Sequence, residues 1–430
     1  MKKYSGIIII LILALVPVVL WFRLPVERFV SLSDGLADVG RLAGLVGAAL
    51  FAINLILSSH LKILEKFFNG LNKVYIKHAL VGKIAVSLLI LHPLFLLGRY
   101  ASGSFSGALN FLSIGSFLPK TYGQISLYIL VALIILTLYL RPKYNIWKIT
   151  HKFMGLAFFL ASLHIYFIPS DVARNMPLRV YMLGLAGLGI TAFLYHTVFG
   201  WLLIKKYKYK VVEVKTLNSN IFEINMEPVG EKLGFKPGQF VFIKFLDKKV
   251  GSEGHPFSMI SVPADNTLSL LVKNLGDHTM KMKELLPGTI AKIEGPFGVF
   301  DYKSAKNKSQ IWIAGGIGIA PFISMARSLS AKDGYKIDLY YCVKNEIEAV
   351  YLGLLQNISM SLSNDLRIFT VYSDEGNRID AEFVQKTSGK LSSKTDIFLC
   401  APPAMIHALK EQFIFKGVSK NLMHSEEFNF

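Results

Sequence analysis

The first half of the chain contains six long apolar runs separated by short loops. Each run approaches the ~20 residues that a helix needs to cross the ~30 Å hydrocarbon core of a bilayer. At 52% hydrophobic residues the whole chain is also more apolar than an average soluble protein. The runs cover residues 7–22, 42–57, 78–97, 125–140, 153–168 and 181–204. The sequence therefore predicts an all-α membrane domain with six spans.

The first run has two interpretations. Lys2 and Lys3 precede it, as a basic segment precedes the apolar core of a secretory signal peptide. No small-residue cleavage site follows, however, and Trp21-Phe22-Arg23 is typical of an anchor at the membrane interface. We favour a retained span, with a cleaved signal peptide as the alternative.

Basic residues mark one side of the predicted membrane domain. They gather between the second and third runs, between the fourth and fifth, and after the sixth: Lys62, Lys66, Lys73, Lys77, Arg141, Lys143, Lys148, Lys205, Lys206, Lys208 and Lys210. Cytoplasmic loops carry such an excess. We therefore expect an integral protein of the plasma membrane whose two termini, and everything after the sixth run, are cytoplasmic.

The net charge of +18 is unevenly divided. Residues 1–206 hold 20 Lys and Arg against 5 Asp and Glu, which is +15, whereas residues 207–430 hold 27 against 24, which is +3. The basic excess thus belongs to the membrane half, where it serves as a topology signal. This basic excess does not indicate binding to a nucleic acid. We expect membrane lipid to surround this half of the chain.

Four histidines stand in two matched pairs on the third and fifth runs. Thirteen residues separate His78 from His92, and twelve separate His151 from His164. An ionisable side chain inside a membrane is expensive and usually functional. Because the two runs cross in the same direction, His78 can face His151 at one level and His92 can face His164 at a second, ~21 Å away. This arrangement favours two haems held between two helices over histidines that merely bond helix carbonyls.

The helical phase of the second pair is less regular than that of the first. Fourteen positions bring His92 to within ~40° of the face of His78, but thirteen positions leave His164 ~140° from His151 on an ideal helix. A local distortion of the fifth span, or a differently rotated second haem, is therefore expected. His60 and His196 have no partner at a matching depth, so we interpret both as structural.

From residue 207 onward the pattern changes to short alternating strands, followed by strands that alternate with helices. The first group, at residues 207–215, 239–245, 268–273 and 290–294, predicts a small β-barrel. The second group, at residues 310–314, 337–343, 367–372 and 396–400, predicts a parallel, doubly wound α/β sheet. The chain has only two cysteines, Cys342 and Cys400, which suits a reducing cytoplasm rather than a disulfide framework.

A glycine-rich segment follows the first strand of the predicted parallel sheet. It reads Gly315-Gly316-Ile317-Gly318 and continues to Pro321. Glycines at a strand-to-helix turn let a nucleotide pyrophosphate approach the backbone N–H groups of the helix N-terminus. A tight packing turn is the alternative, because the full dinucleotide-binding pattern is not present.

Several further motifs occur in a fixed order, and with them nearly the whole chain resembles the NADPH oxidase and ferric reductase superfamily. The motifs are His255-Pro256-Phe257-Ser258, then Gly276-Asp277-His278-Thr279 preceded by Lys273. The resemblance implies that Phe257 and Ser258 contact the flavin ring, with His255 nearby. It also implies that Thr279 and the backbone amides beside it hold the FAD pyrophosphate, and that the four paired histidines ligate two b-type haems.

The resemblance extends to a nicotinamide site. Gly315, Gly316, Gly318 and Pro321 match the family's glycine motif, and Cys400, Pro402 and Met405 match its cysteine motif, with Ala401 where the family has glycine. This implies that the Cys400 thiol lies beside the hydride path. It implies further that Glu427 and Phe430 belong to a tail whose terminal aromatic ring covers the flavin.

The position of three polar residues bears on the choice of coenzyme. Lys344, Ser373 and Arg378 follow successive strands, where the superfamily places groups that read the 2′-phosphate. Cations there favour NADPH, because an additional phosphate needs charge-assisted hydrogen bonds. Use of NADH as well is the alternative.

Together these motifs imply three domains and one electron path. The expected domains are a six-span di-haem domain at residues 1–206, a β-barrel FAD-binding domain at 207–303 and a Rossmann-like NAD(P)H-binding domain at 304–430. Electrons would pass from NAD(P)H through FAD and two haems to an external acceptor. We favour O2, giving superoxide, with a ferric chelate as the alternative. A haem-binding subunit without catalysis is disfavoured, because it would not need the flavin and nicotinamide motifs. No obligatory protein partner is indicated.

Overall fold

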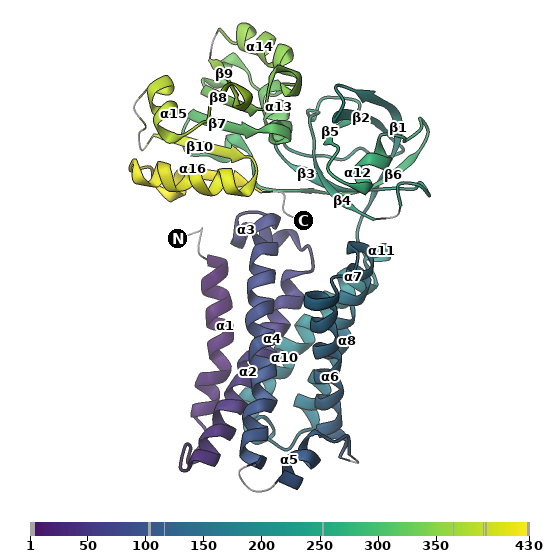
Figure 1. Cartoon of the computed structure of the whole chain (residues 1–430), viewed down its shortest axis with the longest axis vertical. Helices are drawn as coiled ribbons and strands as arrows, with labels where there is room; N and C mark the ends of the chain where they lie inside the picture. Colours follow the sequence, from purple (N-terminus) through teal and green to yellow (C-terminus); the bar gives the residue numbers. More distant parts are fainter. Residues whose placement is uncertain are drawn as a thin grey trace. The chain divides into compact units, whose positions relative to one another are not determined.

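The computed structural model describes residues 5–101, 105–115, 117–251, 253–363, 365–389, 391 and 394–427. The chain divides into two compact units, Met1–Ile204 and Lys205–Phe430, each of which is described by itself. The first unit is helical and the second contains two β-sheets (Figure 1).

Long helices form the first unit. They are α1 (Ser5–Phe22), α2 (Leu32–Leu57), α4 (Leu71–Ala101), α6 (Leu118–Ile135), α8 (Phe153–Phe167) and α10 (Met176–Phe193). The shorter helices are α3 (Lys62–Phe68), α5 (Phe105–Leu112), α7 (Tyr144–His151), α9 (Asp171–Arg174) and α11 (Gly200–Leu203). Two π-helical turns, η2 (Leu136–Leu140) and η3 (Leu194–Val198), continue α6 and α10.

Five of the helical segments are long and apolar enough to cross a membrane, at residues Ser5–Phe22, Leu32–Leu57, Leu71–Tyr100, Leu118–Leu140 and Met176–Val198. They coincide with five of the six predicted spans. The remaining predicted span, residues 153–168, forms α8, which has 15 residues and so falls short of the ~20 that a span needs. Helix α7 precedes α8 in the chain, and Lys152 alone interrupts the helical stretch between them.

Helix α2 is the central element of the first unit. It packs against α1, α4 and α10, while α6 packs against α8 (Figure 1). Small residues permit this close approach: a Cβ atom on Gly189 of α10 would lie 3.0 Å from the backbone of Ala52. Large apolar side chains on α1, such as Ile8, Leu11 and Ile12, are exposed. Exposed apolar side chains of this kind suit a lipid surrounding.

The second unit begins with a six-stranded antiparallel sheet. Its strands are β1 (Tyr207–Thr216), β2 (Ile221–Pro228), β3 (Phe240–Phe245), β4 (His255–Ser258), β5 (Leu268–Lys273) and β6 (Ile290–Phe297), in the order β4-β3-β6-β1-β2-β5. A bridge between Met259 and Leu270 brings the two edges together, as in a barrel. Helix α12 (Asp277–Met282) follows β5. The barrel core is a cluster of apolar residues that includes Val211, Ile224 and Ile243.

A five-stranded parallel sheet completes the unit. Its strands are β7 (Ser309–Gly315), β8 (Lys336–Val343), β9 (Leu366–Tyr372), β10 (Thr395–Cys400) and β11 (Met423–Glu426), in the order β11-β10-β7-β8-β9. The helices are α13 (Ala320–Arg327), α14 (Leu352–Ser361), α15 (Ala381–Ser388) and α16 (Pro403–Phe415). Strand β11 is an edge strand that the sequence patterns did not predict.

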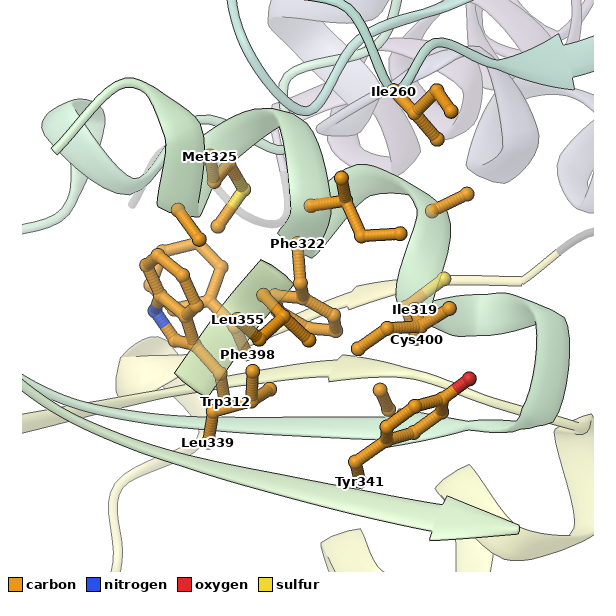
Figure 2. Packing of buried hydrophobic residues seen from close by; sticks show 14 of the residues in the cluster. Ile260, Trp312, Ile319, Phe322, Met325, Leu339, Tyr341, Leu355, Phe398 and Cys400 are labelled. Atoms are coloured by element: carbon orange, nitrogen blue, oxygen red, sulfur yellow. The ribbon is translucent and has the colours of Figure 1, made fainter. Parts of the chain in front are cut away.

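Alternating strand residues pack against helices on both faces of this sheet. Trp312, Leu339 and Phe398 lie in one apolar cluster with residues of α13 and α14 (Figure 2). Ile313 and Leu399 lie in the other cluster, with residues of α15 and α16. This is the doubly wound α/β architecture predicted from the sequence, and the helical unit and the barrel agree with the predicted fold class as well.

Candidate functional site

The four paired histidines are brought together as the sequence predicts. His78 lies on α4 and His151 ends α7, and their ring centroids are 6.3 Å apart at an interplanar angle of 78°. His92, also on α4, lies close enough to His164 of α8 for their charged forms to repel each other. Each pair therefore takes one imidazole from α4 and one from the α7–α8 stretch.

The separation of the first pair fits a shared metal ion. Metal–imidazole bonds are about 2 Å long, so two imidazoles on opposite sides of one ion have ring centres about 6 Å apart. The rings of His78 and His151, at 6.3 Å, are therefore too far apart to stack on each other and would leave room for a metal ion that both could hold.

Backbone carbonyls orient three of the four rings. Nδ1 of His78 lies 3.1 Å from the carbonyl oxygen of Asn54. Nδ1 of His92 lies 2.7 Å from that of Gly40, and Nδ1 of His164 lies 2.7 Å from that of Pro119. A metal-ligating histidine commonly donates its second ring N–H in this way, which leaves Nε2 for the metal. The ring of His151 instead stacks on Trp147, with centroids 5.0 Å apart.

Glycines make room for the rings of His92 and His164. A Cβ on Gly44 of α2 would lie 2.7 Å from Nδ1 of His92, and one on Gly123 of α6 would lie 2.8 Å from Nδ1 of His164. Real side chains essentially never approach so closely. Glycine at these two positions therefore allows each ring to reach its carbonyl acceptor.

The hydrogen-bond pattern of the fifth predicted span changes just after His151. Helix α7 ends at His151 and α8 begins at Phe153, while Lys152 between them keeps helical dihedral angles (φ −62°, ψ −26°) and its N–H donates to the carbonyl oxygen of Ile149. This boundary lies between His151 and His164. A change of helical phase at this point stays a prediction.

The predicted flavin residues lie on and beside β4. His255, Pro256 and Phe257 are partly buried on this strand, and the ring of His255 packs on His278 of α12 with centroids 3.8 Å apart. The Oγ atom of Ser258 is buried and has no hydrogen-bond partner among the described residues. Because a buried hydroxyl is rarely left unpaired, this atom fits a polar group of a bound cofactor.

The predicted phosphate loop forms the turn into α12. The Thr279 hydroxyl accepts hydrogen bonds from the backbone N–H groups of Leu275 (2.9 Å) and Gly276 (3.1 Å), and donates to the Gly276 carbonyl (3.0 Å). These bonds fix the conformation of the loop. Lys273, at the end of β5, pairs with Glu348 at 3.5 Å, so its charge is engaged within the protein.

The glycine motif turns the chain from β7 into α13. Gly315 ends β7, Gly316 has a φ of 54°, and Pro321 stands in the first turn of α13. A Cβ on Gly318 would lie 2.0 Å from the carbonyl oxygen of Cys400, so only glycine fits there. The motif therefore packs directly against the end of β10, where Cys400 is placed.

Cys400 occupies a buried apolar position beside this turn. Its side chain belongs to the same cluster as Ile319 and Tyr341 (Figure 2). Burial raises the pKa of the Cys400 thiol well above its usual value of 9.0, and the neighbouring Glu426 carboxylate raises it further. The thiol is therefore neutral at physiological pH. Burial likewise raises the pKa of Cys342 to about 12.

Glu426 is a buried acidic residue in register with Cys400, and the motifs in the sequence did not point to it. Glu426 lies on β11, and its Oε1 would lie 3.0 Å from a Cβ on Gly298. Glu427, which was predicted, pairs with Lys410 of α16 at 3.3 Å instead. Phe430, the other predicted tail residue, lies outside the described residues. Side chains alternate between the two faces of a strand, so a prediction of β11 would have indicated that Glu426 lies on the opposite face from Ser425 and Glu427.

The barrel and the parallel sheet meet near these residues. Phe240 of β3 is in register with Ser258 of β4, and both its ring and Glu426 would contact a Cβ on Gly298. The hydroxyl of Ser324 on α13 donates to the carbonyl oxygen of Ser261, at 2.6 Å. The predicted flavin residue Ser258 and the predicted nicotinamide residue Cys400 are thus placed around one junction.

The predicted coenzyme-selecting residues lie at one edge of the parallel sheet. Lys344 follows β8 and Ser373 follows β9, and the backbone N–H of Asp374 donates to the Lys344 carbonyl at 3.0 Å. The side chains of Lys344, Ser373 and Arg378 are all exposed. The structure thus brings Lys344 and Ser373 together.

Three protein families match successive parts of the chain. Residues 43–162 match the ferric reductase like transmembrane component, residues 206–315 an FAD-binding domain, and residues 312–411 an oxidoreductase NAD-binding domain. The first of these matches contains three of the four paired histidines, and His164 follows its end by two positions.

Two relatives are similar to parts of the chain. The chain is 25% identical over 287 residues to a heavy chain of the superoxide-generating NADPH oxidase of Dictyostelium discoideum, an alignment that covers 59% of this chain and 40% of the relative. It is 31% identical over 137 residues to dual oxidase 2 of Rattus norvegicus, covering 30% of this chain and 9% of the relative. The chain thus spans less than half the length of these two relatives.

A solved structure shares the fold. The flavohemoglobin of Malassezia yamatoensis with bound FAD and heme superposes with a TM-score of 0.51 and 17% identity, covering 92% of this chain and 96% of that one. At this identity the likeness is one of fold alone. The family matches and the two relatives show that this chain joins a ferric reductase like transmembrane domain to FAD-binding and NAD-binding oxidoreductase domains, and that it is a distant homologue of the NADPH oxidases and dual oxidases.

Proposed function

We propose that the chain is an NAD(P)H-dependent flavo-oxidoreductase that moves electrons across a membrane to a one-electron acceptor. The observation that carries this proposal is the pair of histidine sites along α4. One imidazole pair involves His78 and the other involves His92, fourteen positions or ~21 Å further along the helix. Two metal centres at that spacing would connect the two faces of the helical unit.

The chemistry of the path is supplied by bound groups: FAD converts a two-electron hydride into single electrons, and bis-histidine haems carry electrons without an open iron position. The residues of the chain bind and orient these groups. His78 and His151 would hold one haem, and His92 and His164 the second. The carbonyl acceptors at Asn54, Gly40 and Pro119 fix three of the rings so that Nε2 is the ligand atom.

The dehydrogenase residues have corresponding roles. The unpaired hydroxyl of Ser258 would bond the flavin, and Thr279 holds the loop that would receive its pyrophosphate. The glycine turn at Gly318 would admit the nicotinamide coenzyme against the end of β10. Cys400 stays protonated and uncharged because burial raises its pKa, so it can line the hydride path without attacking the coenzyme.

NADPH is the coenzyme that we favour. The exposed cations of Lys344 and Arg378 follow the adjacent strands β8 and β9, where a 2′-phosphate could be bound. Asp374 and Glu375 lie in the same turn as Ser373. Because their carboxylates would repel a 2′-phosphate, NADH is the alternative coenzyme. If NADPH is preferred, Arg378→Ala should raise the KM for NADPH several-fold and leave the KM for NADH unchanged.

Oxygen, reduced to superoxide, is the acceptor that we favour. The likeness to the superoxide-generating NADPH oxidase of Dictyostelium discoideum supports it. The match of residues 43–162 to the ferric reductase like transmembrane component supports a ferric chelate as the second candidate. The basic loops beside the spans support a plasma-membrane protein whose two termini and dehydrogenase part are cytoplasmic.

The acceptor can be determined with purified protein loaded with FAD and haem. We expect NADPH to drive reduction of cytochrome c that superoxide dismutase abolishes. Reduction of ferric citrate that is insensitive to superoxide dismutase, without superoxide, would establish the ferric reductase in its place. Absence of NAD(P)H oxidation with every acceptor would contradict both.

A further inference from the structure

Two histidines outside the predicted haem pairs lie against each other. His60 stands between α2 and α3, and His196 lies in the π-helical turn η3 that continues α10. Their ring centroids are 4.0 Å apart, with an interplanar angle of 39°. These rings come from segments more than 130 positions apart in the chain, so their contact is a product of the fold.

The backbone is irregular at both histidines. His60 has a φ of 54°, a left-handed conformation that residues other than glycine rarely adopt. His196 lies within five residues of π-helix, a geometry that is rare and frequent at functional sites. Neither irregularity is needed to cross a membrane. Both place an imidazole in the same small cluster.

A tyrosine adds a third donor group. The hydroxyl of Tyr75, on α4, contacts Nε2 of His60, and the two rings meet edge to face with centroids 5.5 Å apart. The cluster therefore presents two imidazoles and one phenol from three separate segments. Imidazole nitrogens suit zinc, copper, nickel and iron ions.

We propose that His60, His196 and Tyr75 form a binding site for a divalent transition-metal ion such as Zn²⁺. A ring nitrogen of His60 and one of His196 lie within 4.8 Å of each other. Two imidazoles on adjacent positions of one metal ion have ring centres about 4.5 Å apart. The observed 4.0 Å therefore needs only a small adjustment of the two rings.

This site is distinct from the haem pairs. The ring centroids of His60 and His196 are 4.0 Å apart, which is too close for a metal ion to lie directly between the two rings. The ring centroids of His78 and His151, at 6.3 Å, leave room for one. A bound ion would tie the loop after α2 to α4 and to the end of α10. Tyr75 stands three positions before His78 on α4 and so shares its helical face, which places the proposed ion beside one haem ligand.

The site can be tested by titrating Zn²⁺ into the tag-free, detergent-solubilised full chain by isothermal calorimetry. We expect His60→Ala and His196→Ala each to lose the same one equivalent of Zn²⁺ that the wild-type protein binds. Tyr75→Phe, which removes only the oxygen, should weaken that equivalent about tenfold. The visible haem spectrum of each variant verifies that it is folded.

Two control variants separate this site from other histidines. His407→Ala removes an exposed histidine of α16, and His278→Ala removes one ring of the closely packed pair His255 and His278. Both should retain the equivalent that His60→Ala loses. The proposal is overturned if His60→Ala and His196→Ala bind as much Zn²⁺ as the wild type, or if the equivalent disappears only in a control variant. Should His196→Ala fail to fold, His196→Phe retains a ring of similar shape and gives the same test.

Discussion

His78 of α4 and His151 of α7 hold their imidazole rings 6.3 Å apart, centroid to centroid, at an angle of 78°. This is the separation of two ligands on opposite sides of one metal ion. The next histidine along α4, His92, lies near His164, which we propose as its partner. Because each site takes one ligand from α4 and one from the α7–α8 stretch, these two parts of the chain form the walls of both proposed haem sites.

The pairing makes a prediction about haem content. His92→Ala and His164→Ala should each reduce the haem-to-protein ratio from two to one, because a haem with one remaining imidazole is released. The ratio is measured by the pyridine haemochrome assay, with His407→Ala as the control that retains both haems. Combining the two substitutions should remove no further haem. A second loss in the double variant would show that the two residues serve different haems.

The glycine beside His164 makes a prediction about packing. Gly123→Ala places a Cβ 2.8 Å from Nδ1 of His164, so the ring has to leave the Pro119 carbonyl or the helices have to separate. Overpacking of this kind costs about 1–3 kcal/mol. We expect a lower haem content and a lower melting temperature. Gly187→Ala is the matched control, because a Cβ there meets no atom within 4 Å; equal behaviour of the two variants would refute the prediction.

Thr279 is expected to determine how firmly FAD is retained. Thr279→Ala removes the oxygen that accepts hydrogen bonds from the N–H groups of Leu275 and Gly276. Each of these bonds stabilises the loop conformation by about 1 kcal/mol. The flavin absorbance relative to protein after gel filtration should fall several-fold. Thr279→Ser keeps the oxygen and should retain the flavin. Equal retention by the Ala and Ser variants would show that the hydroxyl has no such role.

The pKa of Cys400 predicts a pH dependence of thiol labelling. Burial and the Glu426 carboxylate raise that pKa well above 9.0, so the protonated thiol persists in the folded protein at pH values where an unfolded chain already forms thiolate. We expect iodoacetamide to leave Cys400 unmodified at pH 8 and to modify it after unfolding, as read by mass spectrometry. Rapid labelling of the folded protein at pH 8 would contradict the assignment.

The same shift links stability to pH. The pKa of Cys400 is higher in the folded than in the unfolded protein. The stability that the buried neutral thiol contributes is therefore fully present below pH 9 and is lost as the pH rises through the folded-state pKa. The melting temperature of the wild type should therefore fall more steeply above pH 9 than that of Cys400→Ala. Parallel curves for the two proteins would contradict the linkage.

Periodicity and motif spacing predicted the helical unit, the barrel, the parallel sheet and the proximity of His78 to His151. These features depend on which residues are apolar and on regular repeats, both of which are visible in one chain. The acceptors that orient the rings could not be predicted, because Gly40, Asn54 and Pro119 contribute backbone carbonyls, which every residue has. Only the fold determines which carbonyl lies beside a ring.

Two other features were missed for local reasons. Glu426 was passed over in favour of Glu427 because the short edge strand β11 gives too few residues for its alternation to be recognised. The contact of His60 with His196 depends on a left-handed residue and a π-helical turn. Neither conformation follows from the residue types that adopt it, so both histidines were interpreted as structural.

Electron transfer across the membrane is the central claim, and sealed vesicles test it most directly. The purified protein, loaded with FAD and haem, is reconstituted into liposomes that enclose ferricytochrome c, and NADPH is added only to the outside. We predict that the enclosed cytochrome c is reduced, and that His92→Ala abolishes this reduction while the flavin content stays unchanged. Reduction only when NADPH and cytochrome c share the same side of the membrane would contradict the account.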